Sequence, residues 1–454
     1  MKDIWIIILL LSTCCAACSD SVEMSPNILL IVADDAGWND VGYHNEEIIT
    51  PSIDSLARSG VMLENFYVYP TCSPTRASLM TGKYASRFGI YQPIAMKSKQ
   101  VLPSEVTTLP GILRAHGYQT AIFGKWHLGL RPENGPLQYG FDYSYGFLHG
   151  QIDQLTHRYK NGDSSWHRMD KFVDEQGHAT DLIAREAIEF ITSKRDAAKP
   201  FFIYMPFSVP HYPIQESSYW IGKYQNSEMT NSRKQYAASI SHMDHTIGLL
   251  CESLKQQRLS ENTVVIFISD NGGQANWTPT FEYQMKHGPY SQLGDNTPLR
   301  GYKGEVYEGG IRVPAILHWP GKLGSYEYHD LFKITDLLPT LAAVAGVLLP
   351  DELLLDGDDL LPALYQKENM EARELYLRTN QSLMYRKGPW KLIHHASTLD
   401  SANNELFRID RDPKEIENLV SNKPEIFRSL WDALKEQVAI EDSTLMLLKS
   451  PEPM

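Results

Sequence analysis

The sequence predicts an α/β protein with a large, mixed but mostly parallel sheet flanked by helices, followed by a smaller C-terminal α+β domain. Two observations support this class. From residue 27 onward, continuous apolar segments alternate with amphipathic segments of helical period. Four of the apolar segments are followed by acidic, basic or histidine side chains, and ligands bind at the carboxyl ends of parallel strands.

The predicted strands contain almost no polar positions, as expected for strands that are buried on both faces. They cover residues 27–33, 118–123, 201–207 and 263–269. The predicted helices cover residues 51–59, 109–115, 179–195 and 232–258. The first has Thr50 as N-cap, Pro51 at its first position and Gly60 after its last turn, and the second is followed by Gly117.

The pattern changes after Asp351. Short apolar segments at 374–378, 382–395 and 405–409 predict strands joined by turns, and a final helix is predicted near 424–438. We therefore expect the main domain to span residues 27–350 and the C-terminal α+β subdomain to span residues 351–454.

The N-terminal residues resemble an export signal. Within residues 1–17, one lysine precedes the apolar run Ile4–Leu11, which is too short to span a bilayer. The run ends in Ala-Ala-Cys, similar to a bacterial lipobox, which predicts lipidation of Cys18 and leaves residues 18–26 as a tether. Plain signal-peptide cleavage is the alternative. We expect an exported protein, either periplasmic or an outer-membrane lipoprotein of a Gram-negative bacterium.

Composition excludes several classes of protein. With 43% hydrophobic and 21% charged residues, the 454-residue chain is not disordered, collagenous or a coiled coil overall. Its net charge of −13 argues against a nucleic-acid partner. Outside the leader only Cys72 and Cys251 remain, so the protein is not a disulfide scaffold. Cys251 lies in an apolar helical pattern and is predicted to be a buried thiol.

Side chains that suit a hard cation follow two of the predicted strands. Asp34 and Asp35 follow the first strand, and Asp270 and Asn271 follow the last. Carboxylate and amide oxygens favour Ca²⁺, or Mg²⁺, over zinc. Aspartates at strand ends also cap turns, so one pair alone is weak evidence. Two pairs at one edge of a sheet predict a metal site.

Cys72 lies where a short helix is predicted to begin, at Pro74 and Thr75. The positive end of this helix and the neighbouring Arg76 would stabilise an anion and lower the pKa of the thiol. Two interpretations follow, a thiolate nucleophile and an inert buried cysteine. The spacing Cys-x-Pro-x-Arg is restrictive and favours a functional residue.

Several segments resemble the type I, formylglycine-dependent sulfatases. CSPTR at 72–76 is similar to the maturation motif of that family, and GKWHLG at 124–129 is similar to its second motif. Further similar segments are the acidic pair at 34–35, DNG at 270–272 and ELFRIDRDPKEIENL at 405–419. Residues 296–314 most resemble the arylsulfatase B, or N-acetylgalactosamine-4-sulfatase-like, branch. The resemblance implies an alkaline-phosphatase-like fold and a sulfuric-ester hydrolase whose catalytic domain is residues 27–350.

The resemblance also implies a modified nucleophile. A maturation enzyme would oxidise Cys72 to formylglycine, whose hydrate carries two hydroxyl groups. One hydroxyl would coordinate Ca²⁺ together with the four strand-end ligands and attack the sulfate sulfur, with Arg76 favouring its ionised form. His127 would take the proton from the second hydroxyl, which expels sulfate and restores the aldehyde.

Three further side chains receive roles from the same resemblance. Lys125, His211 and Lys303 would surround the sulfate oxygens. His211, or alternatively Lys303, would protonate the departing sugar alcohol. Each side chain could instead be ordinary, a satisfied histidine or a solvated lysine. The positions of His127 and His211 after predicted strands favour catalytic roles.

Two other functions stay open. One is a phosphodiester or phosphonate-ester hydrolase of the same fold, although such relatives tend to have Asp-His where this chain has Asp270-Asn271. The other is a catalytically inactive, surface-bound glycan-binding lipoprotein, which the complete set of catalytic side chains disfavours.

The expected substrate is a sulfated carbohydrate, such as a glycosaminoglycan or a fragment of an algal polysaccharide, because an exported lipoprotein meets polysaccharides first. The loops at 145–157 and 276–298 are expected to shape the sugar site. Their aromatic side chains suit stacking on sugars and are Tyr145, His149, Trp277, Tyr283 and Tyr290.

Overall fold

The structure, a computed structural model, describes residues 25–96, 98–367, 372–399 and 403–449. The predicted signal segment, Cys18 and most of the tether lie outside these residues. In the part of the chain that is described, no helix combines the length and the apolar character needed to cross a bilayer.

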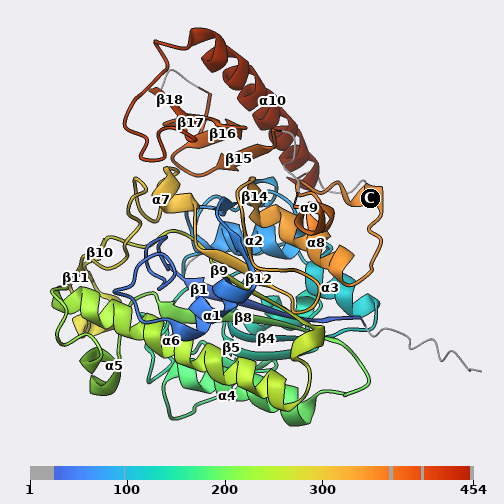
Figure 1. The fold of residues 1–454 in the computed structure, drawn as a ribbon, viewed down its shortest axis with the longest axis vertical. Coiled ribbons are helices and arrows are strands. Elements are labelled where there is room, and N and C mark those ends of the chain that lie inside the picture. The colour runs from blue at the N-terminus through green and yellow to red at the C-terminus, as the bar shows by residue number, and fades with distance from the viewer. Residues whose placement is uncertain (1–24, 97, 368–371, 400–402, 450–454) are drawn as a thin grey trace, which may run out of the picture.

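A ten-stranded mixed sheet forms the centre of the molecule (Figure 1). Its five neighbouring strands β9, β1, β8, β4 and β5 are parallel, and antiparallel pairs flank them on both sides. In spatial order the strands are β13 (Tyr326–Tyr328), β2 (Val61–Leu63), β12 (Ala315–His318), β9 (Thr263–Ser269), β1 (Asn27–Asp34), β8 (Phe201–Pro210), β4 (Gln119–Lys125), β5 (Tyr143–Phe147), β6 (Trp166–Arg168) and β7 (Lys171–Phe172).

The central strand β1 shows why these segments are apolar throughout. All eight of its residues are buried, because β8 and β9 pair with its two edges and helices cover both faces of the sheet. Alternate side chains enter two different cores, so neither face tolerates polar residues. The predicted α/β class and its four buried strands are confirmed, and β8 continues past its predicted end to Pro210.

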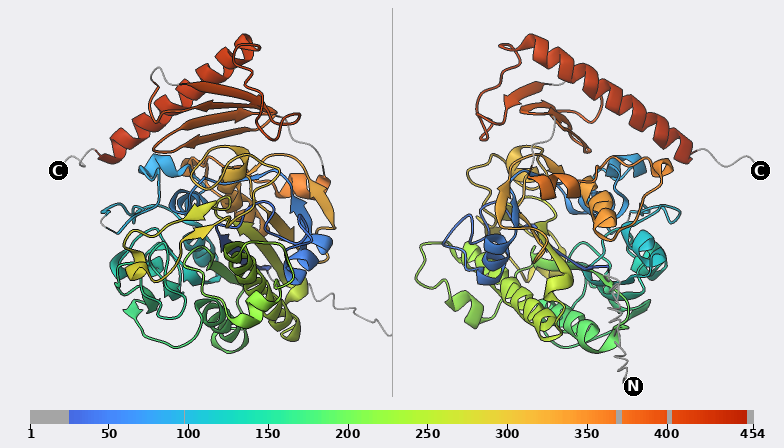
Figure 2. Two further views of the ribbon diagram at one scale, coloured as in Figure 1. Left: turned by 90° about the vertical axis from the view of Figure 1, so that its left-hand side faces the viewer. Right: turned by 45° about the vertical axis from the view of Figure 1, so that its right-hand side comes forward.

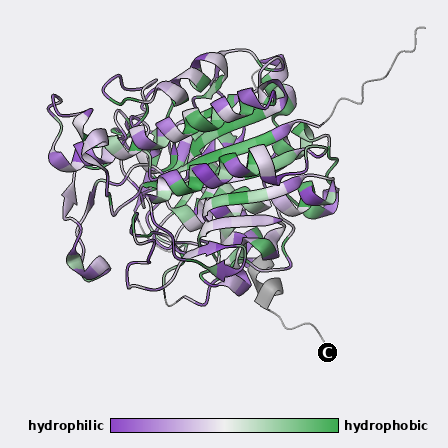
Figure 3. Cartoon of the chain, turned by 90° about the horizontal axis from the view of Figure 1, so that it is seen from below, coloured by the Kyte–Doolittle hydropathy of each residue, from purple (hydrophilic) through white to green (hydrophobic). Residues whose placement is uncertain are grey.

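Helices cover the two faces of the sheet, and the strands between them are the most hydrophobic segments of the chain in this view (Figure 3). One face packs against α1 (Pro51–Ser59), α4 (Ala179–Glu189) and α6 (Asn231–Gln256). The other packs against α2 (Cys72–Thr81), α3 (Leu109–Ala115) and α8 (Leu337–Val344). The shorter helices are α5 (Ser218–Gly222), α7 (Glu308–Ile311) and α9 (Leu361–Gln366).

The N-terminus of α1 is capped differently from the sequence-based prediction. The Thr50 side chain makes no cap. Instead the backbone N–H groups of Ser52 and Ile53 donate hydrogen bonds of 2.7–3.2 Å to the carboxylate of Asp244 on α6. Gly60 is extended, at φ −122°, rather than left-handed. A tertiary contact therefore supplies the cap that local sequence was expected to supply.

The other predicted helices keep their places with one change. Gly117, predicted to follow α3, is left-handed at φ 89°. The structure adds an N-cap, because the Thr108 side chain accepts from the Gly111 N–H at 3.3 Å. The helix predicted over 179–195 is α-helical only to Glu189 and continues as a π-helical turn. Cys251 on α6 is partly exposed rather than fully buried.

The C-terminal residues form a separate four-stranded antiparallel sheet with one long helix against it (Figure 2). The long segment predicted as one strand is a hairpin. The elements are β15 (Glu374–Arg378), β16 (Leu383–Lys387), β17 (Trp390–His394), β18 (Asn404–Arg408) and α10 (Pro424–Lys449). Two small sheets pair β3 (Phe66–Tyr67) with β14 (Phe332–Lys333) and β10 (Asn276–Trp277) with β11 (Tyr290–Ser291).

A buried ion cluster joins this C-terminal sheet to the main domain. The ammonium group of Lys391 on β17 lies 2.9 Å from the Glu308 carboxylate at the start of α7 and 2.8 Å from that of Glu415. All three side chains are fully buried. Because the opposite charges lie in contact, each one compensates the other for the loss of solvation that burial causes.

Candidate active site

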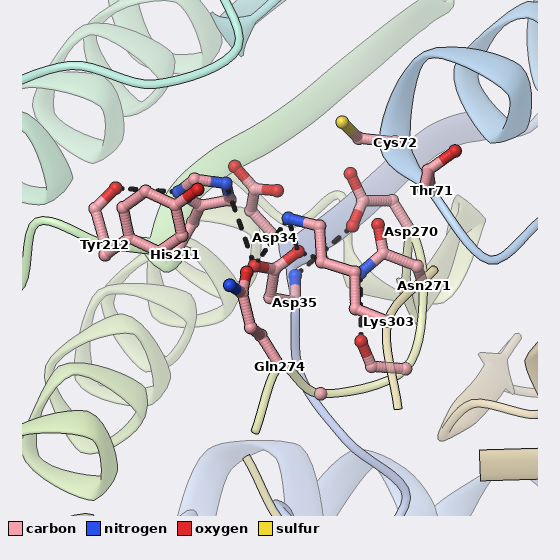
Figure 4. A network of polar contacts seen from close by, with 12 residues as sticks. Asp34, Asp35, Thr71, Cys72, His211, Tyr212, Asp270, Asn271, Gln274 and Lys303 are labelled. Atoms are coloured by element: carbon pink, nitrogen blue, oxygen red, sulfur yellow. Dashed lines mark hydrogen bonds and ion pairs between the residues drawn. The ribbon is translucent and has the colours of Figure 1, made fainter. Parts of the chain in front are cut away.

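The polar residues predicted at the strand ends meet at one edge of the sheet (Figure 4). β1 brings Asp34 and Asp35 there, and its neighbour β9 brings the pair at 270–271. β8 and β4 bring His211 and the segment 125–127. Parallel pairing places all four carboxyl ends on the same side, so the convergence follows from the topology.

Two lysine–aspartate pairs occupy the centre of this site. The Lys303 ammonium lies 2.7–2.8 Å from both carboxylate oxygens of Asp35, and Lys125 lies 2.8–2.9 Å from those of Asp34. Arg76 donates to Asp270 at 2.7 and 3.1 Å, so its guanidinium faces a carboxylate. These cations compensate three buried carboxylates in the protein as it stands.

The two adjacent aspartates differ in acidity. Burial raises the pKa of Asp34 to about 7, against the opposing charge of Lys125. Burial would also raise the pKa of Asp35, but Lys303 and His211 lower it to about 2. The Nε2 atom of His211 lies 3.7 Å from Asp35. Asp35 is therefore the carboxylate that stays ionised throughout the neutral range.

The donor set fits a hard divalent cation. The carbonyl oxygen of the Asn271 side chain is buried and has no hydrogen-bond partner among the described residues, while its amide group donates to Asp35 at 2.8 Å. A buried acceptor without a donor is costly, and a cation is the partner that its oxygen lacks. Asp34, Asp35 and His211 also place possible ligand atoms within 4.8 Å of one another.

Cys72 is the first residue of α2 and faces His127. Its sulfur lies 3.2 Å from His127 Nδ1, and His127 Nε2 lies 3.1 Å from the Ile94 carbonyl oxygen. Because a carbonyl only accepts, Nε2 carries the proton, which leaves the Nδ1 lone pair directed at residue 72. Burial, followed by Lys125, holds the pKa of His127 well below its usual value, so the ring is neutral and basic at Nδ1.

The expected low thiol pKa of Cys72 is not found. Burial raises it, and the nearby ammonium groups of Lys125 and Lys303 only partly oppose this. Desolvation of a thiolate outweighs the helix end and the cations here. An unmodified Cys72 is therefore a poor thiolate nucleophile.

His211 is held by a stack of aromatic rings. Its Nδ1 donates to the carbonyl of Tyr212 at 2.7 Å, which leaves Nε2 facing the site. The Tyr212 ring stacks on Trp277 with centroids 4.2 Å apart, and Trp277 stacks on Tyr290 at 5.7 Å. Burial, then Lys303, lowers the pKa of His211 well below its ordinary value.

A pocket of about 530 Å³ opens above Cys72. Its lining includes His127, His211 and Lys303, but not Lys125, which is fully buried beneath it. None of the five aromatic side chains predicted to contact sugar lines this pocket, and all five are buried. The residues in their place are Gln151, Tyr159, Lys160, Tyr212, Gln274 and Tyr302. The sequence could have suggested three of them, because Tyr212 and Tyr302 adjoin the predicted residues His211 and Lys303, and Gln151 lies in the predicted loop 145–157.

Comparisons with known proteins agree with this site. A family model described as Sulfatase matches residues 26–347, and one described as N-sulphoglucosamine sulphohydrolase, C-terminal, matches residues 302–441. N-acetylgalactosamine-6-sulfatase of Canis lupus familiaris is 31% identical over 409 residues, which are 85% of this chain and 75% of that protein. Arylsulfatase A of Bos taurus is 30% identical over 484 residues, and the match covers 96% of this chain and 90% of that protein.

A solved structure resembles the whole described fold. The crystal structure of Ps i-CgsB in complex with k-i-k-neocarrahexaose has a TM-score of 0.82, 29% sequence identity, and covers 91% of this chain and 93% of that one. Assignment to the arylsulfatase B branch stays a prediction. The match over most of the chain and the set of side chains at one sheet edge lead to the same result: this chain belongs to the sulfatase family and is a sulfuric-ester hydrolase.

Proposed function

We propose that the protein hydrolyses a sulfate ester on a sulfated carbohydrate, using a formylglycine made from Cys72 by a maturation enzyme and a bound Ca²⁺ or Mg²⁺. The observation that supports this most directly is the contact between residue 72 and the basic Nδ1 of His127, at the floor of a pocket that also contains Lys303. A raised thiol pKa is consistent with a cysteine that acts only after modification.

Four side chains would hold the cation, namely Asp34, Asp35, Asp270 and Asn271 through its unpartnered carbonyl oxygen. A cation bound there supplies Lewis-acid stabilisation of the sulfate charge and lowers the pKa of a hydroxyl at residue 72. Lys125 and Lys303 hold two of these carboxylates in place through their ion pairs.

Two histidines would move protons on opposite sides of the sulfate. His127 would accept a proton at Nδ1 from residue 72. His211 would donate one from Nε2 to the leaving alcohol. Burial and Lys303 disfavour the protonated form of His211, so an anionic ester in the pocket is needed to raise its pKa and charge it. Lys303 is the alternative proton donor because it lines the same pocket.

The class of substrate is inferred from the neighbours and the predicted export. Ps i-CgsB was solved with a neocarrahexaose, and the relatives N-acetylgalactosamine-6-sulfatase are named for a sulfated amino sugar. A lipoprotein anchored through Cys18 at a bacterial outer membrane, or a periplasmic protein, would meet such polymers.

The test combines mass spectrometry with an ester assay on protein made with its maturation enzyme. We expect the tryptic peptide containing residue 72 to be lighter by about 18 Da than the same peptide with an unmodified cysteine. This is the mass lost when the thiol is converted to the aldehyde whose hydrate is the nucleophile. We expect aryl sulfate turnover that Cys72→Ala abolishes, and little aryl phosphate turnover. An unmodified thiol in active protein would refute the mechanism. Phosphate esters cleaved faster than sulfate esters would favour the phosphoesterase alternative, and a fully modified but inactive protein would favour the glycan-binding one.

A further inference from the structure

A second basin lies beside the active-site pocket and shares a wall with it. It has a volume of about 410 Å³, and both cavities are lined by Tyr159 and Lys160. Two loops far apart in sequence build it, one between β5 and β6 and one between β10 and β11. The N–H of Tyr283 donates to the carbonyl of Lys160 at 2.8 Å and ties these loops together. Each cavity is within the size range of sites for small ligands.

Three cationic side chains line the basin, in a protein that is acidic overall. They are Arg158, Lys160 and Lys286, and Asp153 is the one carboxylate among the lining residues, while Asp174 and Glu282 outside the lining pair with Arg158 and Lys160. The Asp153 carboxylate is already engaged, since it accepts the N–H of Thr156 at 2.8 Å and lies 3.0 Å from His287 Nε2. Because Asp174 neutralises Arg158, the cations left to attract an anion to this basin are Lys286 and the loosely paired Lys160.

Lys160 and Lys286 differ from the buried cations of the active site because their ammonium groups are loosely paired or unpaired among the described residues. Lys160 lies 3.7 Å from Glu282, whose other oxygen accepts the backbone N–H of Thr280 at 2.8 Å. Among the described residues, no carboxylate lies within ion-pair distance of Lys286, which is exposed. Loosely paired ammonium groups exchange water or a weak partner for an anion at little cost.

Lys160 stands at the junction of the two cavities. Its ammonium group is 5.8 Å from the ring centre of Tyr159 and 5.6 Å from that of Phe281, which hold its stem between the loops. A ligand whose sulfate reaches Cys72 through the first cavity can therefore place an adjacent group in the second without leaving the protein surface.

We propose that this basin, lined by Arg158, Lys160 and Lys286, binds the sulfate or carboxylate of the sugar next to the one whose sulfate is cleaved. The substrate is then a polyanionic oligosaccharide rather than a singly sulfated one. This inference rests on the proposed function, because it assigns the first cavity to the reacting sulfate.

The experiment compares matured wild type with Lys160→Gln, Lys286→Gln and the double variant. Lys255→Gln, an exposed lysine on α6 away from both cavities, is the matched control. Binding is measured calorimetrically with carrageenan and chondroitin oligosaccharides of equal length, each prepared with and without a second sulfate. Hydrolysis of an aryl sulfate is followed in parallel.

We expect wild type to bind the doubly sulfated forms more tightly than the singly sulfated forms. In the double variant this ratio of affinities should fall by about tenfold or more, which corresponds to the loss of one charge-assisted hydrogen bond. The preference should also weaken with added salt. A loss of affinity in the double variant for singly sulfated chondroitin, but not for singly sulfated carrageenan, would identify carboxylate as the second anion. A loss confined to the doubly sulfated forms would identify sulfate.

Affinities for all four oligosaccharides that are the same in wild type and in the double variant would overturn the basin proposal. Failure of the proposed function has a different signature, namely matured wild type that cleaves no sulfate ester, including the aryl sulfate, whatever it binds.

Discussion

The basic Nδ1 of His127 lies 3.2 Å from the sulfur of Cys72, and the Ile94 carbonyl fixes which ring nitrogen carries the proton. The ring is buried and its pKa is lowered, so its Nδ1 is a proton acceptor directed at the group at residue 72. In the proposed mechanism this contact serves the second of two steps at residue 72.

Replacing His127 by Ala should separate those two steps. We expect steady-state kcat on an aryl sulfate to fall by about 10²–10⁴, the usual contribution of a general base. The first turnover should remain visible as a burst of about one phenol per site. Rapid-quench measurement of phenol release checks this, with the exposed His116→Ala as control. A slow first turnover without a burst would mean that His127 acts earlier.

Ca²⁺ should stabilise the protein through Asn271. At one hundred times its Kd, a cation that binds only the folded state adds about 2.7 kcal/mol to the free energy of unfolding. We expect this increase in wild type and in the surface control Asn226→Ala, but not in Asn271→Ala, which removes the unpartnered oxygen. Thermal unfolding with and without Ca²⁺ measures it. A larger shift with Zn²⁺ would contradict the hard-cation site.

Replacing Lys391, at the junction of the two sheets, should strongly lower the free energy of unfolding. Lys391→Met leaves two buried carboxylates without their cation and should lower the free energy of unfolding by about 3–5 kcal/mol. Lys387→Met is the control: its lysine is half exposed and pairs with Glu374, so a change within about 0.5 kcal/mol is expected. Urea unfolding monitored by fluorescence compares them, and equal losses would refute the argument.

The stability of the protein should fall between pH 6.5 and 9 because of His242. Burial alone would lower its pKa, but hydrogen bonds to Asp181 and Glu216 raise the pKa to about 9. A raised folded-state pKa gives a stabilisation that is complete below the unfolded value of about 6.5. It is lost as pH rises through 9, by up to about 3 kcal/mol.

His242→Gln should flatten this part of the pH–stability curve, while His245→Gln on the exposed side of the same helix should not. Thermal melts at intervals between pH 6 and 9.5 provide the comparison. A wild-type curve that is flat over this range would show that His242 is not charged in the folded protein.

Much of the fold could be predicted because its causes are local. Buried parallel strands require uninterrupted apolar residues, and α3 carries its own cap and left-handed glycine. The exceptions depend on tertiary contacts. Asp244 caps α1 from another helix, and the long predicted C-terminal strand is a hairpin that turns at Gly388, where φ is 54°.

The sequence by itself determined which chemical groups this protein carries and that they meet, because parallel strands must end on the same side of a sheet. Only the tertiary structure decided how those groups are paired. The opposite acidities of Asp34 and Asp35 and the unpartnered oxygen of Asn271 depend on residues hundreds of positions away. The pocket walls, Tyr159 and Lys160 among them, likewise come from loops whose meeting no local pattern encodes.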